Sequence, residues 1–357
     1  MPEESSNFEA ADGIEAVERY GLSPQVVGCI HGPGGAIHPY RLITNLLSNL
    51  LDRHSENFFI ATNTPCTQIQ PPNKSNPFYT LSTPNGHITT SHVIHATNGW
   101  TSHLLTPMRE KIIPARGTMS SQRPGTSLNT TTTLSGYRSY VFLTGSVGYD
   151  YLTQLPSGEN ELMFGGGWAS AQDFALTDIG LSDDSTYSLP VASHLAGALP
   201  LYFGEKNWGR EKVVKEGDSK DEIDGVKWGE GRTKAQWSGI LGLSADGQPW
   251  VGRLPSKVSN RQDLSANDTL EFQQSQQEMK GNNETIHSLT APPGEWISAG
   301  YTGEGMVNAW MCGKALAHMV LGRDDEIKDW FPDVMRVTEK RWRKADAADY
   351  IFERLSS

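Results

Sequence analysis

The stretch from residue 296 to residue 322, WISAGYTGEGMVNAWMCGKALAHMVLG, constrains the fold of this chain more than any other. The apolar run Trp296–Ala299 predicts a buried strand, and the pattern from Met306 onward predicts a helix that stops at Gly322. The turn between them contains Gly300, Gly303 and Gly305. The residues expected to pack the helix on a sheet are Val307, Trp310, Leu316, Met319 and Val320, with Ala309, Cys312 and Ala315 as small fillers.

A strand, a glycine turn and a helix start together leave backbone N–H groups pointing outward from the turn. The positive end of the helix dipole lies behind these groups, so the junction can hold an anion or a ring oxygen that gains negative charge. The same residues also fit an ordinary connection inside a protein core. The residues alone therefore leave both a binding site and a core connection open.

The composition, 37% hydrophobic and 20% charged residues, is that of a globular protein. The length of 357 residues is enough for two domains. Its net charge of −11 argues against nucleic acid or an anionic membrane as a partner. No apolar run is long enough to span a bilayer, and the acidic start MPEESSNFEA lacks an apolar secretory core. We therefore expect a cytoplasmic protein that acts on a small molecule, and nothing indicates a partner chain.

The cysteines predict no metal site and no disulfide. Cys29, Cys66 and Cys312 are far apart, odd in number and form no CxxC pair. This pattern fits neither a disulfide framework nor a set of zinc ligands. We expect reduced thiols and a reducing compartment.

One segment imitates a phosphate-binding loop. The apolar run Val26–Ile30 reads as a strand, the glycine-rich residues 31–35 follow it, and a helix is predicted from Pro39 to Leu51. A GxGxxG turn would require glycine where the chain has Ile37, and Pro33 stiffens the loop. We therefore predict no phosphate loop at this place.

Four segments, in this order, resemble the FAD-dependent oxidoreductases of the D-amino-acid oxidase and glycine/sarcosine oxidase superfamily. They are GAIHP at 35–39, ATNGW at 96–100, the run Trp237–Gly252 and AGYTGEGM at 299–306. The resemblance covers most of residues 30–345. It implies an α/β fold, in which an incomplete FAD-binding Rossmann-like three-layer domain is joined to an α+β substrate domain with an antiparallel sheet.

The resemblance also implies the domain boundaries. We expect a polar segment over 1–29, a discontinuous cofactor domain over 30–116 and 236–345, and a substrate domain over 117–235. Residues 256–290 are rich in Ser, Asn and Gln and predict a polar insertion in the cofactor domain. The charged residues Asp325–Leu355 predict an amphipathic helical tail packed on the surface.

In such oxidoreductases, one strand passes the adenine and two small-residue turns contact the dinucleotide and the flavin. Carried over to this chain, non-covalently bound FAD would contact Cys66, Ala96, Thr97, Asn98, Gly99, Trp100, Gly300, Tyr301, Thr302, Gly303, Glu304, Gly305 and Met306. Family members begin with a strand, a GxGxxG turn and a helix, and no such unit precedes the first match here. A truncated gene model, a degenerate homologue that no longer binds FAD and a partner chain that supplies the unit remain open.

The resemblance implies oxidation of the C–N bond of a small amine or amino acid, by hydride transfer to the flavin. We expect His38, Arg116 and Tyr151 in the pocket. Arg116, within the PARG run at 114–117, could instead pair structurally with a carboxylate between the domains, and Tyr151 could be a core aromatic. The alternative function is a homologue without catalysis, retained as a module that binds a small molecule or a protein.

Overall fold

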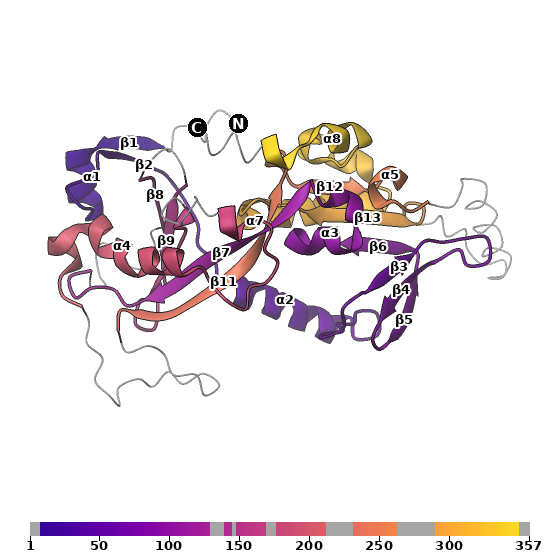
Figure 1. Ribbon diagram of the computed structural model, residues 1–357, viewed down its shortest axis with the longest axis horizontal. Helices are drawn as coiled ribbons and strands as arrows, with labels where there is room; N and C mark the ends of the chain where they lie inside the picture. The colour runs from indigo at the N-terminus through magenta and orange to yellow at the C-terminus, as the bar shows by residue number, and fades with distance from the viewer. Residues whose placement is uncertain are drawn as a thin grey trace.

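The computed structural model describes residues 8–128, 139–144, 148–168, 176–211, 231–262 and 290–349. The molecule is elongated, and two long antiparallel strands, β7 (Ile112–Gln122) and β11 (Thr233–Ser244), run between its two ends (Figure 1). Most of the polar insertion predicted at 256–290 lies outside the described residues.

One end of the molecule is an antiparallel sheet covered on one face by a helix. Strands β8 (Ser139–Phe142), β9 (Asp150–Gln154) and β10 (Leu162–Gly165) join β7 and β11 in the order β11-β7-β10-β9-β8. This five-stranded sheet confirms the antiparallel sheet that was predicted. Helix α4 (Leu189–Trp208), kinked at Gly204, packs its apolar side on the sheet. The core between them contains Leu152, Leu162, Phe164, Leu195, Leu199 and Phe203.

A small N-terminal unit packs beside this sheet. It consists of β1 (Glu9–Asp12), α1 (Gly13–Tyr20) and β2 (Gly28–His31), and β1 pairs antiparallel with β2. Asp12 caps the helix by accepting a hydrogen bond from Glu15 N at 2.9 Å. The unit contributes Ala16 and Leu22 to the core under α4, so it is part of the packed structure.

The other end contains two small sheets. Strands β12 (Trp250–Arg253), β13 (Gly294–Ala299) and β6 (His92–His95) form one sheet, in which β13 and β6 are parallel. Strands β3 (Gln68–Gln70), β4 (Tyr79–Thr83) and β5 (Gly86–Thr90) form an antiparallel meander. Short helices connect these strands: η2 (Asn98–Trp100), α3 (Thr101–Leu104), η3 (Thr106–Met108) and α5 (Ser256–Ser259).

Two longer helices of this end leave much apolar surface exposed. Helix α2 (Pro39–Arg53) begins at the predicted proline, yet it has no buried residue. Helix α7 (Gly305–Val320) buries Cys312, Ala315, Leu316 and Met319. The expectation that Val307 and Trp310 pack on the sheet is wrong, because they are 73% and 65% exposed. A sheet of three strands covers only one side of a helix that is apolar on both sides.

The predicted C-terminal helical tail is also wrong over the described residues. Three short elements occupy this segment: η6 (Asp324–Ile327), η7 (Asp333–Met335) and α8 (Glu339–Lys344). Pro332 lacks a backbone N–H and interrupts the helical pattern. Ile327 and Phe331 are buried against α7, so the segment packs into a core. Residues 350–357 lie outside the described residues. Among the described helices, none combines the length and apolar character that crossing a bilayer requires.

A buried carboxylate fastens α4 to the five-stranded sheet. Asp150 Oδ2 lies 2.6 Å from His194 Nε2 and accepts a hydrogen bond of 2.6 Å from Tyr202 Oη, and Asp150 Oδ1 accepts one of 2.6 Å from Gly167 N. Burial by itself would raise the pKa of Asp150, but the hydrogen bonds from His194, Tyr202 and Gly167 outweigh it and hold that pKa below its ordinary value.

We expect Asp150→Asn to lower the free energy of unfolding by about 2 kcal/mol near neutral pH, because a charged hydrogen-bond acceptor is lost. Since the native state holds the pKa of Asp150 down, its contribution is present above the ordinary aspartate pKa and is lost as pH falls below about 4. Urea unfolding between pH 3 and 7 measures both effects. The exposed Asp329→Asn is the control, and an equal loss in both variants would contradict this role for Asp150.

Candidate functional site

The loops after β6 and β13 meet because the two strands are parallel and neighbouring. Asn98 follows β6, and its Oδ1 accepts hydrogen bonds from Gly300 N at 3.0 Å and Tyr301 N at 3.3 Å. Asn98 has a φ of 41°, a left-handed conformation that asparagine tolerates better than most residues. The ATNGW and AGYTGEGM segments, 200 residues apart in the chain, therefore form one loop cluster.

Strand β11 adds a third backbone to this cluster. Thr302 N donates to Gly242 O at 2.8 Å, and Thr302 Oγ1 accepts from Ser244 N at 3.0 Å. A Cβ at Gly99 would lie 2.7 Å from Leu241 O, and one at Gly242 would lie 2.5 Å from Asn98 Oδ1. Glycine is therefore required at both positions for the three backbones to approach so closely. We call residues 96–100, 242 and 300–306 the glycine cluster.

The outer side of the glycine cluster is open. Gly300 and Gly303 have positive φ, at 81° and 85°, which turns the chain sharply between β13 and α7. A Cβ at Gly303 or at Gly305 would meet no heavy atom within 4 Å. Helix α7 begins after Glu304 without a side-chain cap, so its first-turn N–H groups have no side-chain acceptor. These donors suit an anionic or electron-rich ligand edge.

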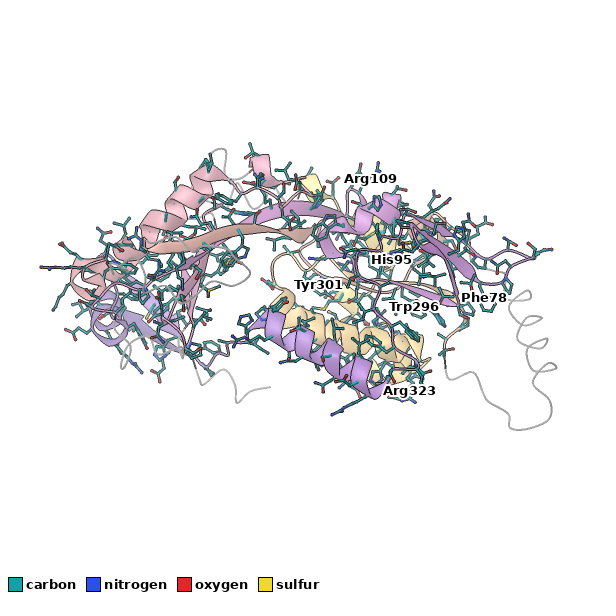
Figure 2. All side chains as sticks on the ribbon, turned by 90° about the horizontal axis from the view of Figure 1, so that it is seen from below. Phe78, His95, Arg109, Trp296, Tyr301 and Arg323 are labelled. Carbon is teal, nitrogen blue, oxygen red and sulfur yellow. The ribbon has the colours of Figure 1, made fainter. Side chains whose placement is uncertain are left out.

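Two side chains of the turn point inward and stabilise it. Tyr301 lies between β13 and the first turn of α7 (Figure 2), and its hydroxyl is 2.7 Å from Ser298 Oγ. Burial raises the pKa of Tyr301 above that of a free phenol, so the hydroxyl stays protonated at neutral pH. Thr302 is also buried. Around Gly303 and Gly305 the turn therefore offers backbone groups to a ligand, beside the exposed side chain of Glu304.

The other residues predicted to contact the cofactor lie at the end of β6 and in the loop after it, or, in the case of Cys66, beside the β3–β5 meander. Ala96 is exposed at the end of β6, and Thr97 Oγ1 is 2.9 Å from Thr101 Oγ1. Trp100 Nε1 donates to Ser182 O at 3.1 Å, which links the cluster to the segment that precedes α4. Cys66 lies beside the β3–β5 meander, against a core formed by Ile69, Tyr79 and Val93.

Arg116 and Tyr151, both predicted in the pocket, lie on opposite faces of the five-stranded sheet. Arg116 contacts Asp178 through Nε at 2.8 Å and Nη2 at 2.7 Å, and its Nη1 donates to Thr186 O at 3.2 Å. These contacts match the structural alternative for Arg116. His38 is at the start of α2, where its Nδ1 accepts from Arg41 N at 3.4 Å. The described contacts do not join the three residues to each other.

Tyr151 belongs to a row that crosses all five strands on the face turned away from α4. The pairing register places Val141, Tyr151, Gly165, Met119 and Trp237 side by side. A Cβ at Gly165 would lie 2.1 Å from Met119 Sδ and 2.7 Å from Tyr151 Oη, so both side chains lie over this glycine. We call this side of the sheet the open face, since Val141, Tyr151 and Trp237 in this row are 63%, 40% and 38% exposed.

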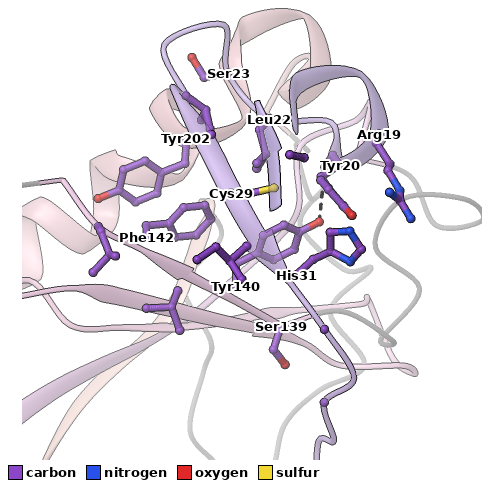
Figure 3. Close-up of a pocket in the computed structure, with 18 of the residues that line it drawn as sticks. Arg19, Tyr20, Leu22, Ser23, Cys29, His31, Ser139, Tyr140, Phe142 and Tyr202 are labelled. Atoms are coloured by element: carbon purple, nitrogen blue, oxygen red, sulfur yellow. Dashed lines mark hydrogen bonds between the residues drawn. The ribbon is translucent and has the colours of Figure 1, made fainter. Parts of the chain in front are cut away.

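A cavity of about 1750 Å³ reaches the β8 edge of the open face. It lies between the N-terminal unit and β8, and Val141 lines both the cavity and the open face. Figure 3 shows its aromatic lining, in which Tyr140 Oη donates to Tyr20 O at 3.4 Å. Tyr151 lies close to this edge. Its pKa is raised to about 12, mainly by burial and to a smaller extent by the neighbouring Tyr149 and Asp150.

Tyr151 was predicted in the pocket from the sequence, whereas Met119 and Trp237 were not. Their common face follows from strand register, which the sequence does not state. The run Gly165-Gly166-Gly167 was the available signal, since glycine inside a strand often marks a place where another group lies close.

We expect Asn98→Gly to keep the left-handed backbone but to lose both bonds to the turn. The free energy of unfolding should then fall by about 1 to 2 kcal/mol, because two partly buried backbone donors lose their acceptor. Chemical denaturation measures the change. Asn308→Ala, which removes only an exposed 3.3 Å bond to Glu304 O, is the control. An Asn98→Gly variant as stable as this control would contradict the role of Asn98.

The chain matches the family profile described as FAD dependent oxidoreductase over residues 5–319. Similar solved structures include glycine oxidase from Geobacillus kaustophilus, with 15% identity and a TM-score of 0.59 over 93% of this chain and 67% of that one. Fructosyl amine: oxygen oxidoreductase (amadoriase I) from Aspergillus fumigatus has 12% identity and a TM-score of 0.58, over 96% and 65%. L-proline dehydrogenase from P. horikoshii has 16% identity and a TM-score of 0.53, over 97% and 69%.

At these identities the solved structures support the fold alone, and this chain spans about two thirds of their length. No curated protein matches the chain. The family profile, however, covers far more than half of the sequence, and the glycine cluster lies within it. The chain belongs to the FAD dependent oxidoreductase family.

Proposed function

We propose that this protein oxidises the C–N bond of a small amine or amino acid, with FAD as the hydride acceptor. The observation that carries the proposal is the open, uncapped start of α7 within the glycine cluster. A helix N-terminus preceded by a glycine turn stabilises negative charge that develops on a bound ring during reduction. Membership of the FAD dependent oxidoreductase family supports the same chemistry.

The residues of the glycine cluster fit FAD by the kind of groups they offer. The backbone around Gly303, Gly305 and Met306 would hold the electron-rich edge of the ring, since a Cβ at either glycine would meet no heavy atom within 4 Å. FAD, when bound, supplies the two-electron acceptor that the side chains of this protein lack. We propose non-covalent binding, with Ala96 to Trp100 beside the dinucleotide.

The open face would orient the substrate. Strand β11 carries Gly242 in the glycine cluster and Trp237 on the open face, so one rigid element links both parts of the proposed site. The substrate amine loses a hydride from its α-carbon and becomes an iminium, which water hydrolyses to a carbonyl compound and ammonia, or an amine where the nitrogen carries a second substituent. Tyr151, with its pKa raised to about 12 by burial, remains a hydrogen-bond donor and does not act as a base at neutral pH.

A second candidate function is a non-catalytic module that binds a small molecule or a protein. The exposed apolar surface favours it: α2 has no buried residue, and α7 exposes Met306, Val307 and Trp310. Apolar patches of this kind mark binding surfaces in many proteins. The two candidates differ in whether FAD binds to the glycine cluster.

Titration of the purified protein with FAD separates them. We expect saturable binding, seen as a change in the visible flavin spectrum and in flavin fluorescence. Gly305→Asp should weaken FAD binding at least fivefold, which corresponds to about 1 kcal/mol. The new carboxylate would interact with the positive end of the helix dipole in place of the ring and would repel negative charge on the ring. The same carboxylate favours the helix itself, so the variant should unfold no more easily than the unmodified protein.

Gly313→Asp is the matched control, since a Cβ at Gly313 also meets no heavy atom within 4 Å but lies in the middle of α7. It should leave FAD binding unchanged. Failure of the unmodified protein to bind FAD would rule out the oxidoreductase function for this chain. Equal loss in both variants would place the cofactor away from the start of α7.

A further inference from the structure

Among the residues that the structure describes, the middle of the open face contains no charged side chain. Its central row consists of Val141, Tyr151, Gly165, Met119 and Trp237, and the next row in register consists of Ser139, Thr153, Met163 and Ser121. These two rows thus contain two large aromatic rings and two thioethers. A substrate that lies on this face meets apolar atoms and neutral hydroxyls.

The cations of the same sheet already have carboxylate partners. Arg116, on the α4 side, pairs with Asp178 at 2.7 Å. Arg123 pairs with Glu159 at 2.7 Å, and Lys234 pairs with Glu161 at 2.7 Å. None of these three side chains is therefore available to hold a second carboxylate without giving up its own partner.

In the cavity beside the open face, the basic side chains also contact carboxylates. Among the described residues that line it, the cationic or ionisable basic side chains are Arg19 and His31. Both contact Glu9, at 3.5 Å and 3.0 Å, and Arg19 also contacts Glu15 at 3.2 Å. The positive charge near the β8 edge is thus balanced by carboxylates of the N-terminal unit.

Recognition of a substrate carboxylate would require a different surface. Carboxylates are held in proteins by charge-assisted and often bidentate hydrogen bonds, above all from arginine. Transfer of an ionised carboxylate to an apolar surface without such donors is strongly unfavourable. An ammonium group, in contrast, is attracted to the faces of tyrosine and tryptophan rings.

We infer, on the basis of the oxidation proposed above, that the site takes amines whose carbon substituent is apolar or aromatic and carries no carboxylate. Tyr151, Met119 and Trp237 are the residues that determine this specificity. Met119 and Tyr151 lie over Gly165 and give a continuous apolar platform, and Trp237 extends it onto the strand that reaches the glycine cluster.

Phenethylamine and L-phenylalanine test this inference, because they differ only in the carboxylate. We expect phenethylamine to bind at least tenfold more tightly, measured by isothermal titration of the protein with and without FAD. Met119→Arg places a guanidinium on the open face and should shift the preference toward phenylalanine by at least tenfold. Val141→Arg, on the exposed edge of the same face, should shift it in the same direction and serves if Met119→Arg does not fold.

Leu189→Arg is the control variant. Leu189 is 72% exposed at the start of α4, on the other side of the sheet, so the added charge should leave the preference unchanged. Arg41→Ala tests whether the start of α2 recognises a carboxylate, and it should not change the ratio of the two affinities.

Equal or tighter binding of phenylalanine by the unmodified protein would overturn the inference, as would binding of neither probe. Turnover of phenylalanine but not of phenethylamine would overturn it while leaving the proposed oxidation intact. Preference for phenethylamine without FAD binding would support the specificity and rule out the oxidation. A preference that Leu189→Arg changes as much as Met119→Arg would show that total charge, and not the open face, decides binding.

Discussion

The two hydrogen bonds accepted by Asn98 Oδ1 hold the candidate site together, since they join the loop after β6 to the turn after β13. Parallel pairing places both loops at one edge of the small sheet, the edge where ligands bind in open α/β sheets. Gly99 and Gly242 let β11 pass close enough for Gly242 O to accept a bond from Thr302 N. A side chain at either position would separate the three backbones and move the start of α7.

The two parts of the proposed site have different electrostatic character, and one strand links them. The glycine cluster offers partial positive charge from an uncapped helix, which suits a ring that becomes electron-rich on reduction. The open face offers aromatic and thioether groups without charge, which suits an apolar substituent. Because β11 contributes to both, a displacement of the glycine cluster would also change the distance between the cofactor position and Trp237.

The parts of the fold with local signals could be predicted from the sequence. Pro39 marks the start of α2, and the glycines at 300, 303 and 305 mark the turn before α7. The glycine cluster was predicted through the resemblance, which brought together segments that are distant in the chain.

Features that depend on long-range packing could not be predicted. The apolar pattern of α7 does not say which side faces the sheet, so Val307 and Trp310 were expected in the core but are exposed. The open face depends on strand register, and so Tyr151 is the one residue of its row that the sequence placed in the pocket. The tail after α7 has a helical pattern, but Pro332 and the burial of Phe331 impose short, separate elements.

Hydrogen exchange at the amides of Gly303, Gly305 and Met306 tests whether the start of α7 holds the flavin, because it reports on the backbone groups expected to contact the ring. We expect these amides to exchange more slowly once FAD is added, whereas amides in the distant strand β4 keep their rates. Unchanged exchange at the first turn of α7 in a protein that has bound FAD would contradict this expectation, since the cofactor would then lie elsewhere.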